Sequence, residues 1–476
     1  MSFTNLLFLF LFLPISLTVY YVSNDSIKEY VLLVVSLVFY AFGSLTYLTL
    51  FIIAILITVA IGRAISYLTD DIFRKIMLVL GVLLNLSLLL YYKYTDFIIS
   101  IWNKASGEEH ELQYLLLPLG ISFFSFKAIS YLVDVYQRKV VLSDNPVHDM
   151  LYLSFFAQVI SGPLTRYADM NCRLKITDSS KARECFSEGV YRFIIGYNKK
   201  VLIADVMARI SNEVFEHALL SESFSTSYAW LGSVCFSLQL YYDFAGYSDM
   251  AIGISEMFGY YCTENFQYPY MTESIAKFWR RWHISLSHWF RDYVYIPLGG
   301  SRTRKRSREF LNLFVVWLLT GLWHGAAWSF VTWGLGYFAM IVFEKITGIP
   351  DRFQSKLTKC LYRLFTLMFI NAQWVLFRTG SFRRGVDFLK HMLWYHGDTL
   401  TDIRAQFLFK DNIGFIIVAV LLCFPVIPWI EKKMEENQIM MILFQTMVGF
   451  CGCFLFLLSI SFVISGQNNP FAYANF

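Results

Sequence analysis

His324 is the first candidate for chemistry, because its surroundings give an imidazole no ordinary polar role. It lies in the stretch GLWHGAAW, and residues 312–343 contain no Asp, Glu, Lys or Arg. Burial among apolar groups favours the neutral form of imidazole, which is the form that a general base needs. A catalytic role competes with a structural hydrogen bond and, third, with a metal or transported-proton role. The small residues around it leave room for a substrate chain or a neighbouring helix: Gly321, Gly325, Ala326 and Ala327.

The motifs of other catalytic chemistries are missing from the sequence. No HxxxH or HxxE pattern accompanies His324, so we predict no metal site. There is no GxSxG, no Walker A sequence and no GxGxxG. An enzyme built on His324 would hold a donor and an acceptor together and supply a base, without the usual nucleophilic serine. Trp323, directly before the histidine, is a candidate supporting residue.

A second candidate, His283, lies in an aromatic and basic stretch that a lipid-facing helix would not carry. Residues 265–302 read NFQYPYMTESIAKFWRRWHISLSHWFRDYVYIPLGGSR, and each charge at the centre of a spanning helix costs about 2.5–3.5 kcal/mol. The pattern predicts one amphipathic or protein-buried helix over 273–295, ended by Pro297 and the two glycines that follow.

On that helix the two histidines fall on different faces. His283 lies on the aromatic face, whereas His288 lies about 140° away on the charged face with Arg281, so we expect that they do not serve one site. For His288 a solvated or ion-paired side chain is the simplest interpretation. For His283 an interior, hydrogen-bonded histidine competes evenly with a functional role.

Two carboxylates lie in an apolar setting just before this stretch. Asp243 and Asp249 belong to QLYYDFAGYSDMAIG, residues 239–253. Carboxylates inside a membrane protein are costly, so they usually have a partner or a function. The structural interpretation is that they pair with Arg280, Arg281 or backbone amides. The alternative is a proton relay or the orientation of a histidine.

The composition requires that these residues be positioned by membrane helices. The 476-residue chain is 57% hydrophobic and 16% charged, with a mean hydropathy of +0.50, whereas soluble proteins are about 25% charged. We predict an all-α polytopic membrane protein with roughly ten to twelve spanning helices plus shorter re-entrant or interfacial ones, including 149–163 and 186–206. The charge-free run 30–62 is too long for one span, and Gly43-Ser44 offers a break.

One domain is expected over 1–476, with N-terminal helices (1–148), a core that carries the candidate site (149–345) and C-terminal helices (346–476). We see no internal repeat and no nucleic-acid signature. The eight cysteines are scattered, and we interpret Cys451 and Cys453 as small core residues rather than metal or redox groups. No small-residue cleavage site follows the first apolar stretch, so a cleaved signal peptide is not expected.

Basic loops set the expected orientation. By the positive-inside rule, the loops near Arg63 and Arg74, near Arg138, and at 302–308 face the cytoplasm, and the acidic loop 103–111 faces outside. The last of these basic loops contains Arg304, Lys305 and Arg306. A plain topology signal is the simplest interpretation, and binding of an anionic donor's phosphates is the alternative.

The motifs together resemble one family. The stretches 239–253 and 265–302 with LLTGLWHGAAWSF (318–330) resemble the membrane-bound O-acyltransferases, and in particular the bacterial branch that includes alginate O-acetyltransferase. The opening FLFLFLPISLTVYY, the segment PLGISFFSFKAISYLVDVY and the ending NPFAYANF are also similar to that branch. One departure is Phe156-Ala157-Gln158, where FPQ would be expected, and it puts a local backbone bend in doubt.

The resemblance implies a ring of membrane helices around a thinned centre, with funnels from both faces. It implies that His324 is catalytic, that His283 is the family's second histidine, and that acetyl-CoA is the cytoplasmic donor. The acetyl group would pass to an extracytoplasmic acetyltransferase partner or directly to a polysaccharide hydroxyl outside a bacterial inner membrane. In this scheme His324 is the general base, and His283 orients it or shares its proton. Asp243, Asp249 and Arg281 would be supporting residues.

Three functions remain open from the sequence. The first is acetylation of an exported polysaccharide such as alginate. The second is peptidoglycan O-acetylation or D-alanyl transfer to teichoic acid by the same fold. The third is a proton-coupled transporter, which the lack of repeated halves disfavours.

Overall fold

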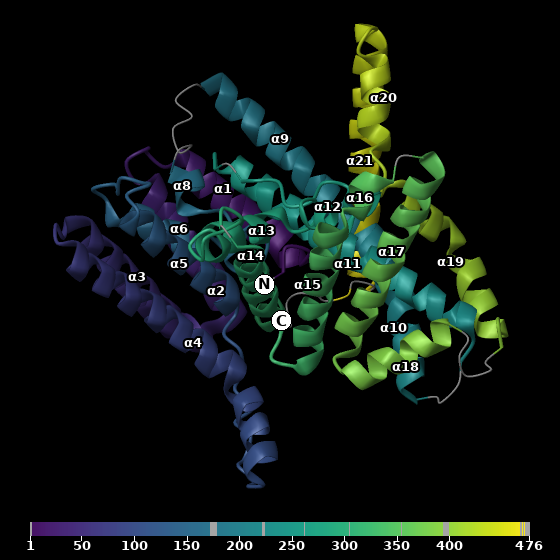
Figure 1. The fold of residues 1–476 in the computed structure, drawn as a ribbon. Helices are drawn as coiled ribbons and strands as arrows, with labels where there is room; N and C mark the ends of the chain where they lie inside the picture. Colours follow the sequence, from purple (N-terminus) through teal and green to yellow (C-terminus); the bar gives the residue numbers. More distant parts are fainter. Residues whose placement is uncertain are drawn as a thin grey trace.

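The structure, a computed structural model, describes residues 2–171, 179–220, 224–260, 262–303, 305–353, 355–393, 399–466, 469 and 471. Every regular element in these ranges is helical (Figure 1), which confirms the all-α class. Arg304 lies outside the described residues, so one of the three residues proposed for an anionic donor has no structural account.

The N-terminal third forms long hairpins. A π-helical turn (Phe8–Phe12) leads into α1 (Leu13–Val22), and α2 (Lys28–Ser44) is separated from α3 (Leu48–Tyr67) by a single 3₁₀ turn. The α-helix is therefore interrupted at the expected position, Gly43-Ser44, although 28–67 still counts as one membrane-length stretch. The 36-residue helix α4 (Asp71–Ser106) is capped by Asp70, whose carboxylate accepts hydrogen bonds from two backbone amides. Helix α5 (Ile121–Tyr136) follows. The next three helices are short: α6 (Pro146–Ser154), α7 (Phe156–Val159) and α8 (Tyr167–Asn171).

The backbone bends between α6 and α7 although the expected proline is replaced. Phe155 leaves the helical conformation, with φ −51° and ψ 115°, and the amide of Phe156 donates to Ser36 Oγ at 3.2 Å. The side chain of Ser36 therefore takes the amide that the bend removes from the helix, and Ala157 is accommodated there without proline.

Fewer helices than expected could cross a membrane on their own. Within the described ranges, four stretches are long and apolar enough: 28–67, 71–106, 356–379 and 438–464. Helices α19 (Ile403–Leu421) and α20 (Val426–Met434), bent by 54°, make a fifth if they form one span. The expected ten to twelve is higher because it counted segments such as 225–242 and 312–328, whose helices are less apolar. The chain is still a multi-pass membrane protein.

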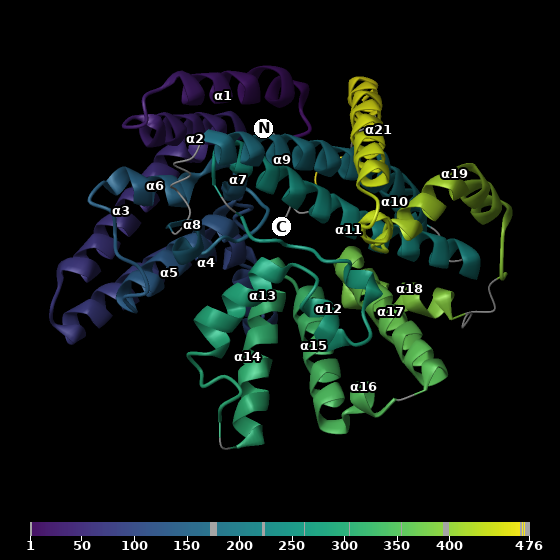
Figure 2. The ribbon, with the colours of Figure 1, turned by 90° about the horizontal axis from the view of Figure 1, so that it is seen from above.

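The centre of the fold is a pair of helices in backbone contact. Helix α9 (Ser179–Asn198), continued by a π-helical turn (Lys199–Ala204), runs beside α11 (Thr226–Met257) (Figure 2). Four glycines face each other in two pairs, Gly189 with Gly253 and Gly196 with Gly246. A Cβ on any of them would lie 2.5–2.7 Å from the carbonyl oxygen of its counterpart, so side chains are excluded from this contact.

Both ends of the described chain pack on this pair. The rings of Phe3 and Phe471 each stack on Tyr247 of α11, with centroid distances of 4.8 and 4.5 Å. Residues far apart in sequence thus meet at one aromatic ring, and α10 (Asp205–Leu220) packs along the same helix.

A second group of helices carries His324 and the glycines and alanines around it. Helices α14 (Arg306–His324) and α15 (Trp328–Thr347) form a hairpin, and α17 (Lys356–Thr379) lies beside α15 (Figure 2). A Cβ on Gly321 would lie 2.5 Å from the carbonyl oxygen of Phe330. The small residues near His324 therefore admit a neighbouring helix, one of the two uses expected for them. Short helices α16 (Ile349–Arg352) and α18 (Phe382–Met392) flank α17.

Helix α21 (Gln438–Ile464) projects to one side of the molecule (Figure 1). Cys451 and Cys453 are exposed on it, so their interpretation as core residues was wrong. Their apolar run faces outward because almost none of this helix is buried against the rest of the chain.

The expected helix over 273–295 is interrupted. It is divided into α12 (Ile275–Trp279), α13 (Ile284–Phe290) and a π-helical turn (Arg291–Tyr295). Between the first two, His283 adopts a left-handed conformation with φ 44° and ψ 55°. The face assignment drawn from a continuous helix was therefore wrong. The end of the stretch was correct, since Gly299 and Gly300 both have positive φ angles.

Gly246→Val tests the backbone contact between α9 and α11. The added side chain would meet the carbonyl of Gly196, and such overpacking costs about 1–3 kcal/mol or more. We expect a lower thermal unfolding midpoint for the detergent-purified protein. Gly449→Val in α21 is the matched control, because a Cβ there meets nothing within 4 Å. Equal midpoints for the two variants would contradict this packing.

Candidate functional site

His324 is the last residue of α14 and lies in an aromatic enclosure. Its side chain is buried, with 2% of the residue exposed. Its ring meets Trp323, Trp333 and Phe377 at centroid distances of 4.8, 4.9 and 5.4 Å, all nearly edge to face. These rings exclude water from the imidazole, which favours its neutral form.

Helix α4 fixes the end of α14 that carries His324. Lys93 Nζ donates to the carbonyl oxygen of Trp323, and Tyr94 Oη donates to that of Leu322 at 2.6 Å. Carbonyls in the last turn of a helix have no partner within it, and a cation there also meets the negative end of the helix dipole. The two side chains therefore hold the turn from which His324 projects.

His283 is buried at the break between α12 and α13. Its residue is 1% exposed, and its Nδ1 lies 3.1 Å from Asn265 Oδ1. The backbone around it is tied down, because the amide of Ile284 donates to the carbonyl of Asn265 at 3.0 Å and that of Gln267 to the carbonyl of Arg281 at 3.0 Å. These two bonds turn the His283 side chain into the protein interior.

The two histidines belong to one buried region. Trp323 lies beside both, with its ring 4.8 Å from that of His324 and 6.1 Å from that of His283. The two imidazoles are near enough to interact electrostatically. His288 is partly exposed and is not part of this enclosure. That His283 and His288 do not serve one site stays a prediction, and the continuous helix used to reach it is interrupted.

Asp243 and Asp249 are ion-paired, but not with the expected arginines. Lys200 Nζ lies 2.7 Å from an oxygen of Asp243 and 2.6 Å from one of Asp205, and all three side chains are at most 4% exposed. Asp249 pairs with Lys199 at 2.7 Å and with Arg192 at 3.0 Å. Both carboxylates therefore hold the α9 segment on α11, which supports the structural interpretation with different partners.

The remaining basic candidates lie apart from the histidines. Arg281 donates to the carbonyl oxygen of Met271 at 3.1 Å and so supports the loop before α12. Lys305 and Arg306 are exposed at the start of α14. The basic loops near Arg63, Arg74 and Arg138 do converge, since all three residues line one cavity of about 430 Å³, as loops on one side of a membrane would.

A cavity of about 460 Å³ extends along α14 on the side of the broken segment. It is lined by Trp317 and Thr320, which lie seven and four residues before His324 and therefore on the same face of α14. Its other wall carries Arg280, His288 and Arg291. It thus joins an apolar lining near the histidine's helix face to a cationic rim.

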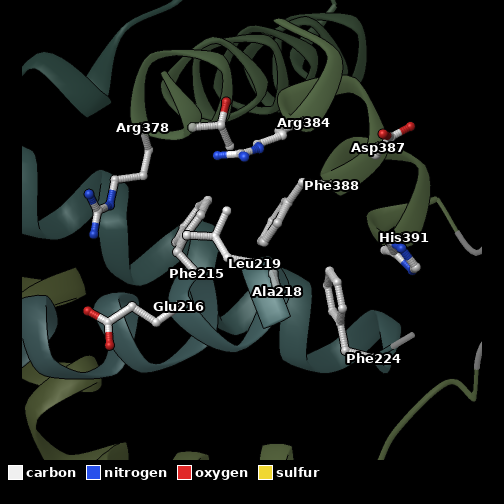
Figure 3. A pocket seen from close by; sticks show the side chains of 11 residues that line it. Phe215, Glu216, Ala218, Leu219, Phe224, Arg378, Arg384, Asp387, Phe388 and His391 are labelled. Carbon is white, nitrogen blue, oxygen red and sulfur yellow. The ribbon is translucent and has the colours of Figure 1, made fainter. Parts of the chain in front are cut away.

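A separate cavity of about 480 Å³ lies where α10, α17 and α18 meet (Figure 3). The Arg378 guanidinium lies 5.7 Å from the centroid of the Phe215 ring, and Arg384 and Phe388 line the same cavity (Figure 3). Phe377, the neighbour of Arg378, contacts His324, so α17 has one face on the histidine and another on this cavity.

Several residues of the site were missed from sequence. Asn265 opens the quoted motif, but an amide carries no catalytic signature on its own. Lys93 lies in a long apolar helix, where a lone lysine was the available signal. Glu344 is a third: its carboxylate accepts from the amides of Ile275 and Ala276 at 2.8 and 3.0 Å and so caps α12.

Comparison with known proteins places these residues in a family context. Residues 72–349 match the profile of the membrane-bound O-acyltransferase family (MBOAT). A probable alginate O-acetylase of Pseudomonas putida is 36% identical over 88% of this chain and 86% of its own length. A peptidoglycan O-acetyltransferase of Helicobacter pylori is 34% identical over 89% and 86%. A teichoic acid D-alanyltransferase of Bacillus subtilis is 31% identical over 52% and 64%.

Lys93→Met tests the cap on α14. Loss of the ammonium leaves the carbonyl of Trp323 without its donor, at a cost of about 1–2 kcal/mol. We expect hydrogen exchange of the backbone amides in 318–330 to become about tenfold faster. Lys104→Met, at an exposed lysine in the last turn of α4, should leave this exchange unchanged. Equal exchange in the two variants would remove Lys93 from this role.

Proposed function

This chain belongs to the membrane-bound O-acyltransferase family, and we propose that it transfers an acetyl group from acetyl-CoA to a hydroxyl of an exported bacterial polysaccharide. The observation that carries the proposal is the buried pair of histidines at the end of α14 and the break before α13. Both are near aromatic rings. The side chain of His283 is hydrogen-bonded to Asn265, and the turn that carries His324 is held by Lys93 through the carbonyl of Trp323. The chain is an O-acyltransferase, and the acetyl group, donor and acceptor are the parts that we propose.

His324 acts as the general base in this reaction. Its neutral imidazole takes the proton of the acceptor hydroxyl as the oxygen attacks the thioester carbonyl. The C–S bond then breaks, and the departing thiolate recovers a proton. The indole N–H groups of Trp323 and Trp333 are buried and have no acceptor within the described residues. Because both rings contact His324, they are candidates to stabilise the oxyanion of the tetrahedral intermediate.

The donor enters through the cavity along α14. Its cationic rim suits the phosphates of coenzyme A, and its apolar lining suits the pantetheine arm that carries the acetyl group. This assignment replaces Lys305 and Arg306 with Arg280, His288 and Arg291 as donor-binding residues, because only the latter line the cavity. The rim would face the cytoplasm, where acetyl-CoA is made.

The acceptor is proposed from the relatives. The Pseudomonas putida and Helicobacter pylori relatives carry the names of an alginate O-acetylase and a peptidoglycan O-acetyltransferase, and their identities to this chain are nearly equal. Acetyl transfer to an alginate-like polysaccharide is the first proposal, and to peptidoglycan the second. A bacterial inner membrane and an extracytoplasmic acetyltransferase partner complete the scheme. The D-alanyl alternative is less favoured, because that relative matches only about half of this chain.

The role of His324 is tested by the acetyl content of the surface glycan. Cells that carry His324→Ala at a matched protein level should lose about 100-fold or more of the transfer rate, measured by NMR of the purified glycan. His110→Ala, at an exposed histidine in the loop after α4, is the matched control and should leave the acetyl content unchanged. Unchanged acetyl content in His324→Ala would contradict the assignment, and the cell wall would then be analysed for D-alanine esters.

The donor cavity makes a separate prediction. The double variant Arg280→Gln/Arg291→Gln should raise the KM for acetyl-CoA about tenfold or more, with kcat little changed, because it removes charge that holds the donor and not the base. Lys305→Gln/Arg306→Gln removes the same charge from the exposed loop and should leave KM within about twofold. If the loop variant raises the KM for acetyl-CoA more than the cavity variant does, the donor binds at the loop and not in the cavity.

A further inference from the structure

The hydrogen bonds around Asn265 determine which way its side-chain amide points. The backbone N–H of Ser285 lies 3.3 Å from Asn265 Oδ1, and a backbone N–H can only donate. On the other side, Asn265 Nδ2 donates to Ser248 Oγ at 3.0 Å. The oxygen of the amide therefore faces the α13 segment, and its nitrogen faces α11.

The hydroxyl of Ser285 fits the same orientation. It accepts a hydrogen bond from the backbone N–H of Leu164 at 2.9 Å, and it lies 2.8 Å from Asn265 Oδ1. With the amide oxygen on this side, the hydroxyl donates to Asn265 Oδ1 at 2.8 Å in preference to His283 Nδ1, which lies 3.5 Å away. Asn265 is thus held by α11 and α13, and through Ser285 also by the segment after α7.

This orientation fixes the proton on His283. Its Nδ1 lies 3.1 Å from the same Oδ1, and an amide oxygen cannot donate, so Nδ1 carries the hydrogen. A neutral imidazole then has its lone pair on Nε2. That atom is buried and makes no hydrogen bond within the described part of the chain, while the ring packs edge to face on Phe244 at 4.6 Å and lies near Trp323.

We infer that Asn265 is a positioning residue that holds His283 in its Nδ1–H tautomer, so that Nε2 accepts a proton in the reaction. The inference deepens the proposed function and rests on it for its chemical meaning. His324 takes the proton from the acceptor hydroxyl and passes it to His283 Nε2. His283 then donates this proton to the departing thiolate. While His283 is charged, the bond from Nδ1–H to Asn265 becomes charge-assisted and stronger.

The tautomer is tested without any assay of activity. The full-length protein is labelled with ¹⁵N-histidine in nanodiscs, and the His283 signals are identified by their loss in His283→Gln. We expect a protonated Nδ1 and a bare Nε2 in the wild type. Asn265→Asp keeps an acceptor in place and should keep this pattern, whereas Asn265→Leu removes the acceptor and should move the hydrogen to Nε2 in a large fraction of molecules.

Ser248→Ala is the control for a merely structural effect. It removes the other bond of the Asn265 amide and should leave the His283 tautomer unchanged. A hydrogen on Nε2 in the wild type, or an unchanged pattern in Asn265→Leu, overturns the inference. If Asn265→Leu does not reach the membrane, the ¹⁵N spectra of the wild type and of Asn265→Asp together determine the tautomer of His283.

Kinetics give the catalytic consequence. Asn265→Leu should lower kcat about 100-fold or more, with KM for acetyl-CoA within about twofold, and Asn265→Asp should recover most of that loss. If Asn265→Leu moves the hydrogen of His283 to Nε2 but kcat stays normal, the tautomer has no role in catalysis. The assignment of the tautomer itself would still stand. If the wild type transfers no acetyl group, the proposed function fails while the tautomer measurement still stands.

Discussion

The site depends on a short backbone pairing between residues 265–267 and 281–284. Its two hydrogen bonds interrupt what would otherwise be one amphipathic helix. The interruption places a non-glycine residue, His283, in the left-handed region of backbone space, a conformation of that kind costing about 1–3 kcal/mol. The cost is offset by burial and by the hydrogen bonds to Asn265. Without the pairing, the imidazole would follow the face of a regular helix and would not meet Trp323.

Around this pairing, charge serves mainly to join segments. Lys200 between Asp205 and Asp243, and Arg192 with Lys199 around Asp249, each connect α11 to the chain before it. Glu344 connects α15 to the start of α12. Buried ions of this kind are costly unless each has its partner, so they specify one arrangement of the helices. By contrast, the rings that contact His324 are aromatic and uncharged, which suits the proposed base because it must be uncharged at rest.

The sequence predicted the all-α class, which the structure confirms. It also singled out His324 and His283, whose catalytic roles stay predictions, but it did not show how the two come together. His324 was evident because a long apolar run offers a lone imidazole few polar partners, so its presence there points to a specific role. The family resemblance added His283, while its position was derived from a helix that the structure interrupts. Local periodicity cannot reveal such a break, since the two hydrogen bonds that cause it join residues 14 and 19 positions apart in the chain. The partners of Asp243 and Asp249 were wrong for the same reason. Their lysines and arginine come from α9 and the turn that continues it, and nothing in either stretch alone indicates that the two are neighbours.

The glycine contact between α9 and α11 carries a consequence for how such a protein diversifies. The distance between these helices is set by backbone atoms that meet at four glycines, where no side chain can be accommodated. A frame of this kind holds no information about the group that is transferred or the polymer that receives it. Substrate preference must then depend on the segments that pack against α9 and α11, such as the interrupted stretch 275–295 before α14. Relatives with different acceptors can therefore differ there while the two central helices stay the same distance apart.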